Sequence, residues 1–145
     1  MRTRTLTSAV TIVVLMLAGA SAGQEKSNVK INKVPVPVTS AASGQEMYVN
    51  YCASCHGKSA KGDGPAAKAL KVPPTDLTLL TKKNGGKFPS DHIAAILAGS
   101  DVPAHGSAEM PVWGTLFHRM SGGHDSEVQL RISNLTHYLE SMQAH

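Results

Sequence analysis

The stretch Tyr51-Cys52-Ala53-Ser54-Cys55-His56-Gly57 sets the frame for the whole chain. Two cysteines stand three positions apart in it, and His56 directly follows the second. On a helix this spacing separates the two sulfur atoms by about one turn, so both can form thioether bonds to the two vinyl groups of one haem. The next residue then falls beneath the iron. We therefore predict one covalently bound haem c, attached at Cys52 and Cys55, with His56 as an iron ligand.

Three other kinds of site use similar residues. A thioredoxin-type C-x-x-C belongs to a βαβ pattern, which this sequence lacks. A zinc site needs further cysteines or histidines at matched spacing, and the chain has only these two cysteines. A disulfide between adjacent helical turns is strained. Haem attachment also uses both thiols and leaves none free in an oxidising compartment.

The N-terminus predicts export. Arg2 and Arg4 form a short basic head, the run Leu6 to Ala20 is mostly apolar, and Ala20-Ser21-Ala22 offers a small-residue cleavage site. This order is typical of a secretory signal peptide, and the apolar run is short for a membrane span. We expect residues 1–22 to be removed before Gly23 and the mature protein to be periplasmic. The alternatives are cleavage after Ala20 and an uncleaved N-terminal anchor.

Charge excludes one class of partner. The chain carries 14 basic and 10 acidic residues, and loss of Arg2 and Arg4 leaves a net charge of +2. That is too small to indicate nucleic-acid binding. No second apolar run is long enough to span a bilayer, so we expect no stable membrane insertion after cleavage.

The rest of the chain divides into a linker over 23–43 and a domain over 44–145. The linker contains Val34-Pro35-Val36-Pro37-Val38, which favours an extended conformation or a short strand. No internal repeat occurs. The domain contains long stretches rich in Gly and Pro that we expect to be loops. Long loops in a compact domain usually surround a functional group.

Apolar spacing predicts helices and no sheet in the domain. We expect helices over Gln45–Cys55 and Gly114–Met120, and a short one at Pro65–Leu70. A further helix should run through Ile93, Ile96 and Leu97, with Ser90 or Asp91 as its N-cap and an end at Gly99. The last helix should start with Ser126 as its N-cap and Gln129 completing a capping box. The predicted class is therefore all-α, with about three to five helices.

Several motifs together resemble the class I monohaem c-type cytochromes, over Gly44 to about Gln143. They are Gly44-Gln45-Glu46-Met47-Tyr48 before the C-x-x-C-H motif, Gly62-Asp63-Gly64-Pro65, Val72-Pro73-Pro74-Thr75-Asp76-Leu77, Met110-Pro111-Val112-Trp113-Gly114, and Asn134-Leu135-Thr136-His137-Tyr138-Leu139. The resemblance implies a helical fold wrapped around one haem. It also implies that Gly44 and Tyr48 face Tyr138 and Leu139 where the first and last helices cross.

The resemblance further implies that Met110 is the second iron ligand. Met110 lies 54 residues after His56, in a loop stiffened by Pro111 that can fold back over the haem. The alternatives are Met120, His105 and His118. The resemblance also gives His56 a proline-loop carbonyl as hydrogen-bond acceptor, and Pro65, Pro73 and Pro74 are the candidates. Trp113 is expected to be a core aromatic residue near the haem.

The expected function is electron transfer by a His/Met-ligated haem c that cycles between Fe(II) and Fe(III), and we expect no enzyme activity. The alternatives are a haem-based sensor or peroxidase-type enzyme with a displaceable sixth ligand, or a subunit of a larger redox complex. The segment Lys58–Lys87 holds seven lysines and two aspartates. These lysines either steer redox partners with acidic docking surfaces or form an ordinary solvated surface.

Overall fold

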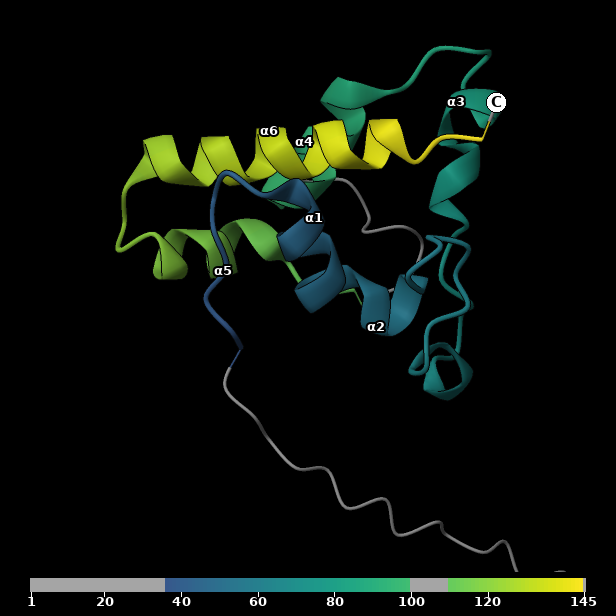
Figure 1. Cartoon of the computed structure of the whole chain (residues 1–145), viewed down its shortest axis with the longest axis horizontal. Coiled ribbons are helices and arrows are strands. Elements are labelled where there is room, and N and C mark those ends of the chain that lie inside the picture. The colour runs from purple at the N-terminus through teal and green to yellow at the C-terminus, as the bar shows by residue number, and fades with distance from the viewer. Residues whose placement is uncertain (1–35, 100–109, 145) are drawn as a thin grey trace, which may run out of the picture. The chain divides into compact units, whose positions relative to one another are not determined.

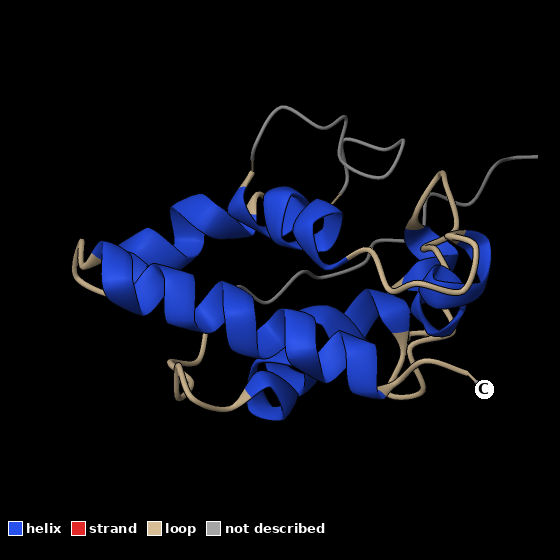
Figure 2. Cartoon of the chain, turned by 90° about the horizontal axis from the view of Figure 1, so that it is seen from above, coloured by secondary structure: helices blue, strands red, loops and turns tan. Residues whose placement is uncertain are grey.

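Helices account for the regular structure of the domain. A computed structural model describes residues 36–99 and 110–144, and no strand occurs in these two ranges. Short turns of 3-10 helix, η2 (Ala67–Ala69) and η3 (Leu77–Leu79), lie in the loops between longer elements. The α-helices are α1 (Gly44–Met47), α2 (Ala53–His56), α3 (Leu80–Lys83), α4 (Ser90–Ala98), α5 (Trp113–Met120) and α6 (Asp125–Ser141). The all-α class is confirmed, and Figure 2 shows only helices and loops.

The helix expected over Gln45–Cys55 forms, but it is interrupted. Between α1 and α2 the chain adopts a turn of π-helix, η1 (Tyr48–Cys52). Ser43 caps α1, because its hydroxyl oxygen accepts a hydrogen bond from the Glu46 amide at 3.1 Å. Asn50, which lies in η1, donates a hydrogen bond from Nδ2 to the Glu46 carbonyl oxygen in α1 at 2.8 Å. Such π-turns occur frequently at functional sites, and this one leads directly into the C-x-x-C-H motif.

The later helices form where the sequence predicts them, but both predicted N-caps were wrong. α4 begins at Ser90 with Pro89 as its N-cap and has no side-chain cap, so neither Ser90 nor Asp91 takes that role. α4 ends at Gly99, whose φ of 79° is the left-handed conformation that favours glycine. α6 begins at Asp125 with His124 as its N-cap, so the Ser126 cap and its capping box with Gln129 were wrong. The reason is the preceding turn. The His124 amide donates to the Ser121 carbonyl at 3.0 Å, and this turn starts the helix before Ser126 is reached.

The first and last helices cross at a glycine. A Cβ atom on Gly44 would collide with the backbone carbonyl of Asn134 and lie 2.7 Å from the Tyr138 Cβ. The Tyr48 and Tyr138 rings pack beside this point with their centroids 5.5 Å apart. The crossing implied by the resemblance is therefore present. In Figure 1, α1 lies against the middle of α6, and α5 runs beside α6.

The segment ahead of α1 belongs to the helical domain. We assigned residues 23–43 to the linker, but Thr39 is 4% exposed and bonds to Tyr51 and Arg131. Asn134 also donates to the Ala41 carbonyl at 2.9 Å. The domain therefore starts before Gly44, because these polar contacts tie residues 37–43 to α6. The strand considered for this region does not form over Val36–Val38, and Val34 and Pro35 lie outside the described residues.

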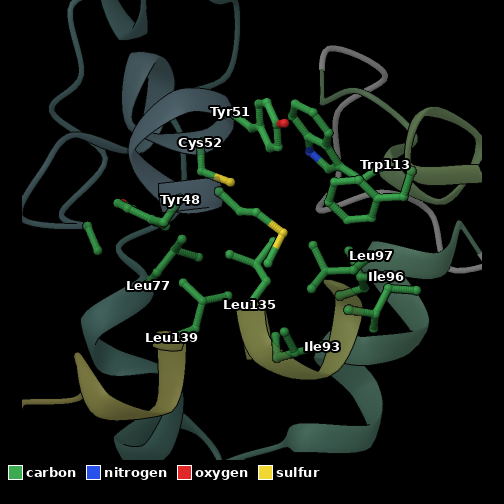
Figure 3. Packing of buried hydrophobic residues seen from close by; sticks show 14 of the residues in the cluster. Tyr48, Tyr51, Cys52, Leu77, Ile93, Ile96, Leu97, Trp113, Leu135 and Leu139 are labelled. Carbon is green, nitrogen blue, oxygen red and sulfur yellow. The ribbon is translucent and has the colours of Figure 1, made fainter. Parts of the chain in front are cut away.

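The core lies between α4, α6 and the first helical segment. Its buried members include Met47, Ile93, Leu97, Phe117 and Leu135. Figure 3 shows these elements converging, with Ile93, Ile96 and Leu97 from α4 opposite Leu135 and Leu139 from α6. Within the described part of the chain, no helix is both long enough and apolar enough to cross a bilayer.

Candidate haem site

The residues predicted to hold the haem line one cavity. Cys52, at the end of η1, and Cys55 and His56, on α2, form one wall, and Met110 contributes to another. About 570 Å³ of space lies between these walls, and part of it is open to solvent. Residues 54 positions apart in the sequence are thus brought to the same site.

The other walls are predominantly apolar. One is the loop that contains Leu70 and the stretch 72–75, and another is formed by Pro111 and Trp113. Few hydrogen-bonding groups line these walls, as a site for a large apolar ring requires.

A second cavity, with about 360 Å³ of space, shares Cys52, His56 and Met110 with the first. It extends inward to aliphatic side chains of α4 and α6, including Ile96, Leu97 and Leu139. In Figure 3 the Cys52 sulfur points into the space that these side chains surround. A cofactor attached at Cys52 would therefore have an apolar surface on its inner side.

His56 is held in one orientation by the backbone. It is 8% exposed, and its Nδ1 lies 3.0 Å from the Thr75 carbonyl oxygen. A carbonyl oxygen only accepts, so Nδ1 carries the hydrogen, and Nε2 of the neutral ring keeps its lone pair. Burial lowers the pKa of His56 below its usual value, and the hydrogen bond to Thr75 opposes part of that shift. A neutral, oriented imidazole is the form that binds iron.

The acceptor for His56 is not a proline carbonyl. We expected Pro65, Pro73 or Pro74, and the structure has Thr75 in this role. Pro65, the first candidate, lies in another loop, whereas Pro73 and Pro74 lie in the right loop beside the true acceptor. Every residue carries a carbonyl, and sequence does not tell which one turns inward. Here the turn is set by Asp76. Its side chain accepts from the Thr78 amide at 2.9 Å and from the Thr78 hydroxyl at 2.6 Å.

The C-terminal end of the chain also supports this loop, which the sequence analysis missed. Gln143 Nε2 donates to the Leu77 carbonyl at 2.8 Å, and its Oε1 accepts from the Thr81 amide at 2.9 Å. The Ala144 amide donates to the Thr78 carbonyl at 2.9 Å. No local sequence signal marks these contacts, because they join residues more than 60 positions apart.

The two cysteines are unpaired and differ in their surroundings. Cys52 is buried and Cys55 is half-buried. Burial, reinforced by the nearby Cys55, raises the pKa of Cys52 to about 12. Among the described residues no group of three or more histidine, cysteine or acidic side chains gathers as a zinc site would require. The disulfide and zinc alternatives therefore find no support in these two ranges.

An aromatic cluster closes the side of the cavity next to Met110. The Tyr51 and Trp113 rings stack with centroids 5.3 Å apart and planes inclined by 27°. Phe117 packs on both, with centroid distances of 6.1 Å to Tyr51 and 5.9 Å to Trp113. Figure 3 shows the stacked pair above Cys52. Trp113 is a buried aromatic at the site, as expected.

Two of the alternative iron ligands, Met120 and His118, do not line either cavity. Met120 is half-buried in the last turn of α5. The His118 side chain is 56% exposed and its Nε2 lies 3.7 Å from an Asp125 carboxylate oxygen. His105 lies outside the described residues.

The site fits a haem c. It combines two thiols and an oriented imidazole on one wall, a thioether on another and apolar surfaces on both sides. A sequence model of the family described as cytochrome c oxidase, cbb3-type, subunit III matches residues 39–120, which is more than half of the chain. Neither the search of curated proteins nor that of solved structures gave a match. The chain belongs to this family, and it is a c-type cytochrome, an electron-transfer protein with one covalently bound, iron-containing haem c.

Proposed function

We propose that the chain is a periplasmic electron carrier in which Cys52 and Cys55 bind the haem and His56 and Met110 are both iron ligands. The observation that carries the proposal is the shared cavity. All four side chains line it, and they come from two segments far apart in the sequence. When bound, the haem supplies an iron that accepts and donates one electron.

Each of these residues has a distinct task. The two cysteine sulfurs hold the cofactor by thioether bonds, so it stays attached during repeated turnover. His56 offers Nε2 in a fixed orientation, because Nδ1 is bonded to Thr75. Met110 offers a thioether that favours Fe(II) and so raises the reduction potential. Two permanent ligands leave no open position for a substrate, so we propose no enzyme activity.

The choice of Met110 over Met120 and His118 is supported by its position. Met110 lines both cavities, with His56 and Cys52 as common neighbours. Met120 and His118 line neither of them. A sensor or a peroxidase-type enzyme would need the sixth ligand to leave, and the packing of Met110 against the core favours a permanent ligand.

A second candidate is a subunit of a larger redox complex. The observation that favours it is the family itself, whose description names an oxidase subunit. The chemistry would be the same in a free carrier and in a subunit. Native purification from periplasm distinguishes them, because a subunit would co-elute with its complex and a free carrier would elute at about 15 kDa or less.

The proposed partners are redox proteins with acidic docking surfaces. All seven lysines of the 58–87 segment are exposed, and Lys68 and Lys71 flank Leu70 on the cavity wall. Val72, on the cavity wall, is 45% exposed, and Val112, next to the wall residue Pro111 in sequence, is 54% exposed. An apolar rim with lysines beside it suits brief docking followed by release.

The test uses Met110→Ala, with Met120→Ala as the matched control. In the native protein a methionine ligand gives the ferric form a weak near-red charge-transfer band. It also gives the ferrous form a methionine methyl resonance shifted far upfield. We expect Met110→Ala to abolish both signals, lower the potential and allow carbon monoxide to bind, because the sixth position is then weakly held. Met120→Ala should change none of these, and the reverse pattern would refute the assignment.

A further inference from the structure

Arg131 carries a buried charge, and the proposed electron-transfer function gives this residue no role. It lies in α6 and is 2% exposed. Its Nη2 bonds to Glu127 Oε1 at 2.8 Å, and its Nε donates to the Ser121 hydroxyl at 3.3 Å. Burying a guanidinium is costly unless its donors are satisfied. The remaining contacts of the group show what this buried charge is for.

Those contacts go to the segment ahead of α1. Arg131 Nη1 donates to the Thr39 carbonyl at 3.0 Å and to the Thr39 hydroxyl oxygen at 3.3 Å. We call Pro37–Thr39 the strap. In Figure 1 the chain ahead of α1 runs past α5 and α6 before α1 begins. One buried side chain on α6 therefore fastens the strap to the domain.

The strap in turn holds Tyr51. The Tyr51 hydroxyl donates to the Pro37 carbonyl at 2.7 Å. Its oxygen also accepts from the Thr39 amide at 3.2 Å and lies 2.8 Å from the Thr39 hydroxyl. Tyr51 has one hydroxyl hydrogen, which goes to Pro37, so the Thr39 hydroxyl is the donor in the last contact. The bonds thus run in one direction, from Arg131 through Thr39 and Tyr51 to Pro37, and such chains are mutually reinforcing.

Tyr51 connects this chain to the cavity. Its ring stacks on Trp113, three residues after Met110, and both rings line the cavity that contains Met110. A Tyr51 ring fixed by the strap fixes the position of Trp113, and Trp113 begins the helix that follows the Met110 segment. The contacts from Arg131 through Thr39 and Tyr51 to Trp113 are thus continuous, and Pro111 and Val112 join Trp113 to Met110 along the backbone.

We propose that Arg131 and the strap are positioning elements for the sixth iron ligand: acting through Tyr51 and Trp113, they hold Met110 at the iron. This rests on the proposed function, in which Met110 is the ligand. Residues that support a ligand fix its geometry and so its affinity for the metal. Loosening the chain of hydrogen bonds therefore makes Met110 easier to displace, even though none of the altered residues contacts the metal.

The test is Thr39→Val in the holoprotein, with Thr136→Val as the matched control. Thr39 and Thr136 are both buried, at 4% and 5% exposed. The Thr136 hydroxyl has no hydrogen-bond partner among the described residues, so its removal breaks no hydrogen bond there. Imidazole is titrated into the ferric protein, and the near-red band reports displacement of methionine. We expect Thr39→Val to bind imidazole roughly two- to tenfold more tightly, the usual range for one hydrogen bond. Thr136→Val should bind it like the wild type.

Two further variants make the outcome decisive. Tyr51→Phe keeps the stacked ring and removes the hydroxyl, so its imidazole affinity should rise as in Thr39→Val. Arg131→Met removes the hydrogen bonds from the guanidinium to Thr39 and should raise the imidazole affinity in the same way. If Thr39→Val and Tyr51→Phe both match the wild type while the native band is present, the positioning role is refuted and Met110 ligation stands. If the native protein lacks the band, the ligand assignment fails and this inference fails with it.

Discussion

The Nδ1 atom of His56 lies 3.0 Å from the backbone carbonyl oxygen of Thr75. Their separation of 19 residues makes the orientation of the predicted iron ligand depend on a distant loop. Hydrogen bonds hold the part of that loop that follows Thr75 in place. The Leu77 amide donates to the Ala60 carbonyl at 2.8 Å, and Asp76 caps the turn through Thr78. The orientation of the His56 ring therefore depends on the turn after Thr75.

Replacement of Asp76 by alanine should loosen that turn. Asp76→Ala removes the acceptor for the Thr78 amide and hydroxyl, and loss of such a cap costs about 0.5–2 kcal/mol of unfolding free energy. Denaturant unfolding of the holoprotein at pH 7 measures it. Thr78→Val loses only the hydroxyl contact and should cost less. Equal stability of wild type and Asp76→Ala would show that the turn is held by other contacts.

The same variant has a predictable pH dependence. The hydrogen bonds from Thr78, foremost among the causes, lower the pKa of Asp76 in the folded protein. A lowered folded pKa means that the carboxylate stabilises the fold above its unfolded pKa of about 3.9. This contribution is lost as the pH falls through the folded pKa. The difference in stability between wild type and Asp76→Ala should therefore be full above the unfolded pKa of about 3.9 and shrink as the pH falls below it, through the lowered folded pKa.

The two cysteines can be separated by single substitutions. Cys52→Ala and Cys55→Ala should each leave one thioether, so a fraction of the haem stays with the chain on a denaturing gel. The double variant should lose all of its haem to acid–acetone extraction, because only His56 and Met110 would then hold it. Haem staining of equal protein loads measures the retained fraction. Full retention in the double variant would contradict attachment at these positions.

Local rules predicted much of this molecule. C-x-x-C-H lies at a helix end because its function requires that spacing, and Gly99 ends α4 because its φ of 79° favours glycine. The helix over Gly114–Met120, predicted from apolar spacing, forms as α5 over Trp113–Met120. These features depend on residues close together in the chain, so the sequence contains them directly.

The features that sequence reasoning missed depend on distant partners. Nothing near Arg131 indicates that it bonds to Thr39, 92 residues earlier. The strap was therefore read as linker, since its composition is that of an extended, polar segment. The inward turn of the Thr75 carbonyl and the Gln143 contacts were missed for the same reason. Such contacts are decided by how helices pack, and single-sequence patterns do not record packing.

The crossing of α1 and α6 should not tolerate a side chain at position 44. Gly44→Ala would place a methyl group against the Asn134 carbonyl and 2.7 Å from the Tyr138 Cβ, and neither is a flexible side-chain end. We expect a loss of about 1–3 kcal/mol, typical of overpacking. Denaturant unfolding of the holoprotein measures it. The neighbouring exposed Gln45→Ala should stay within about 0.5 kcal/mol of the wild type.

Export should leave a defined N-terminus. Small residues at Ala20 and Ala22 favour cleavage after Ala22. Intact-mass spectrometry of the periplasmic protein should therefore find Gly23 as the first residue. Membrane-bound protein that begins at Met1 would instead favour the uncleaved anchor.

Reversing a charge near the cavity should change the rate of electron exchange, and the direction of the change should depend on the charge of the redox reagent. Lys68 is exposed and lies in η2, two residues before Leu70 on the cavity wall, whereas Lys83 is exposed on α3. Lys68→Glu and Lys83→Glu thus make the same change of charge at two different places.

The oxidant is first ferricyanide, an anion, at about 10 mM ionic strength, where screening is weak. The Lys68→Glu protein should then be oxidised roughly two- to fourfold more slowly than the wild type. A cationic cobalt(III) phenanthroline complex should react faster with the same variant. Both effects should fade in high salt, and Lys83→Glu should show smaller ones. Equal rates for the two variants with both reagents, measured by stopped-flow absorbance, would mean that the lysines beside the cavity do not steer partners and form an ordinary solvated surface.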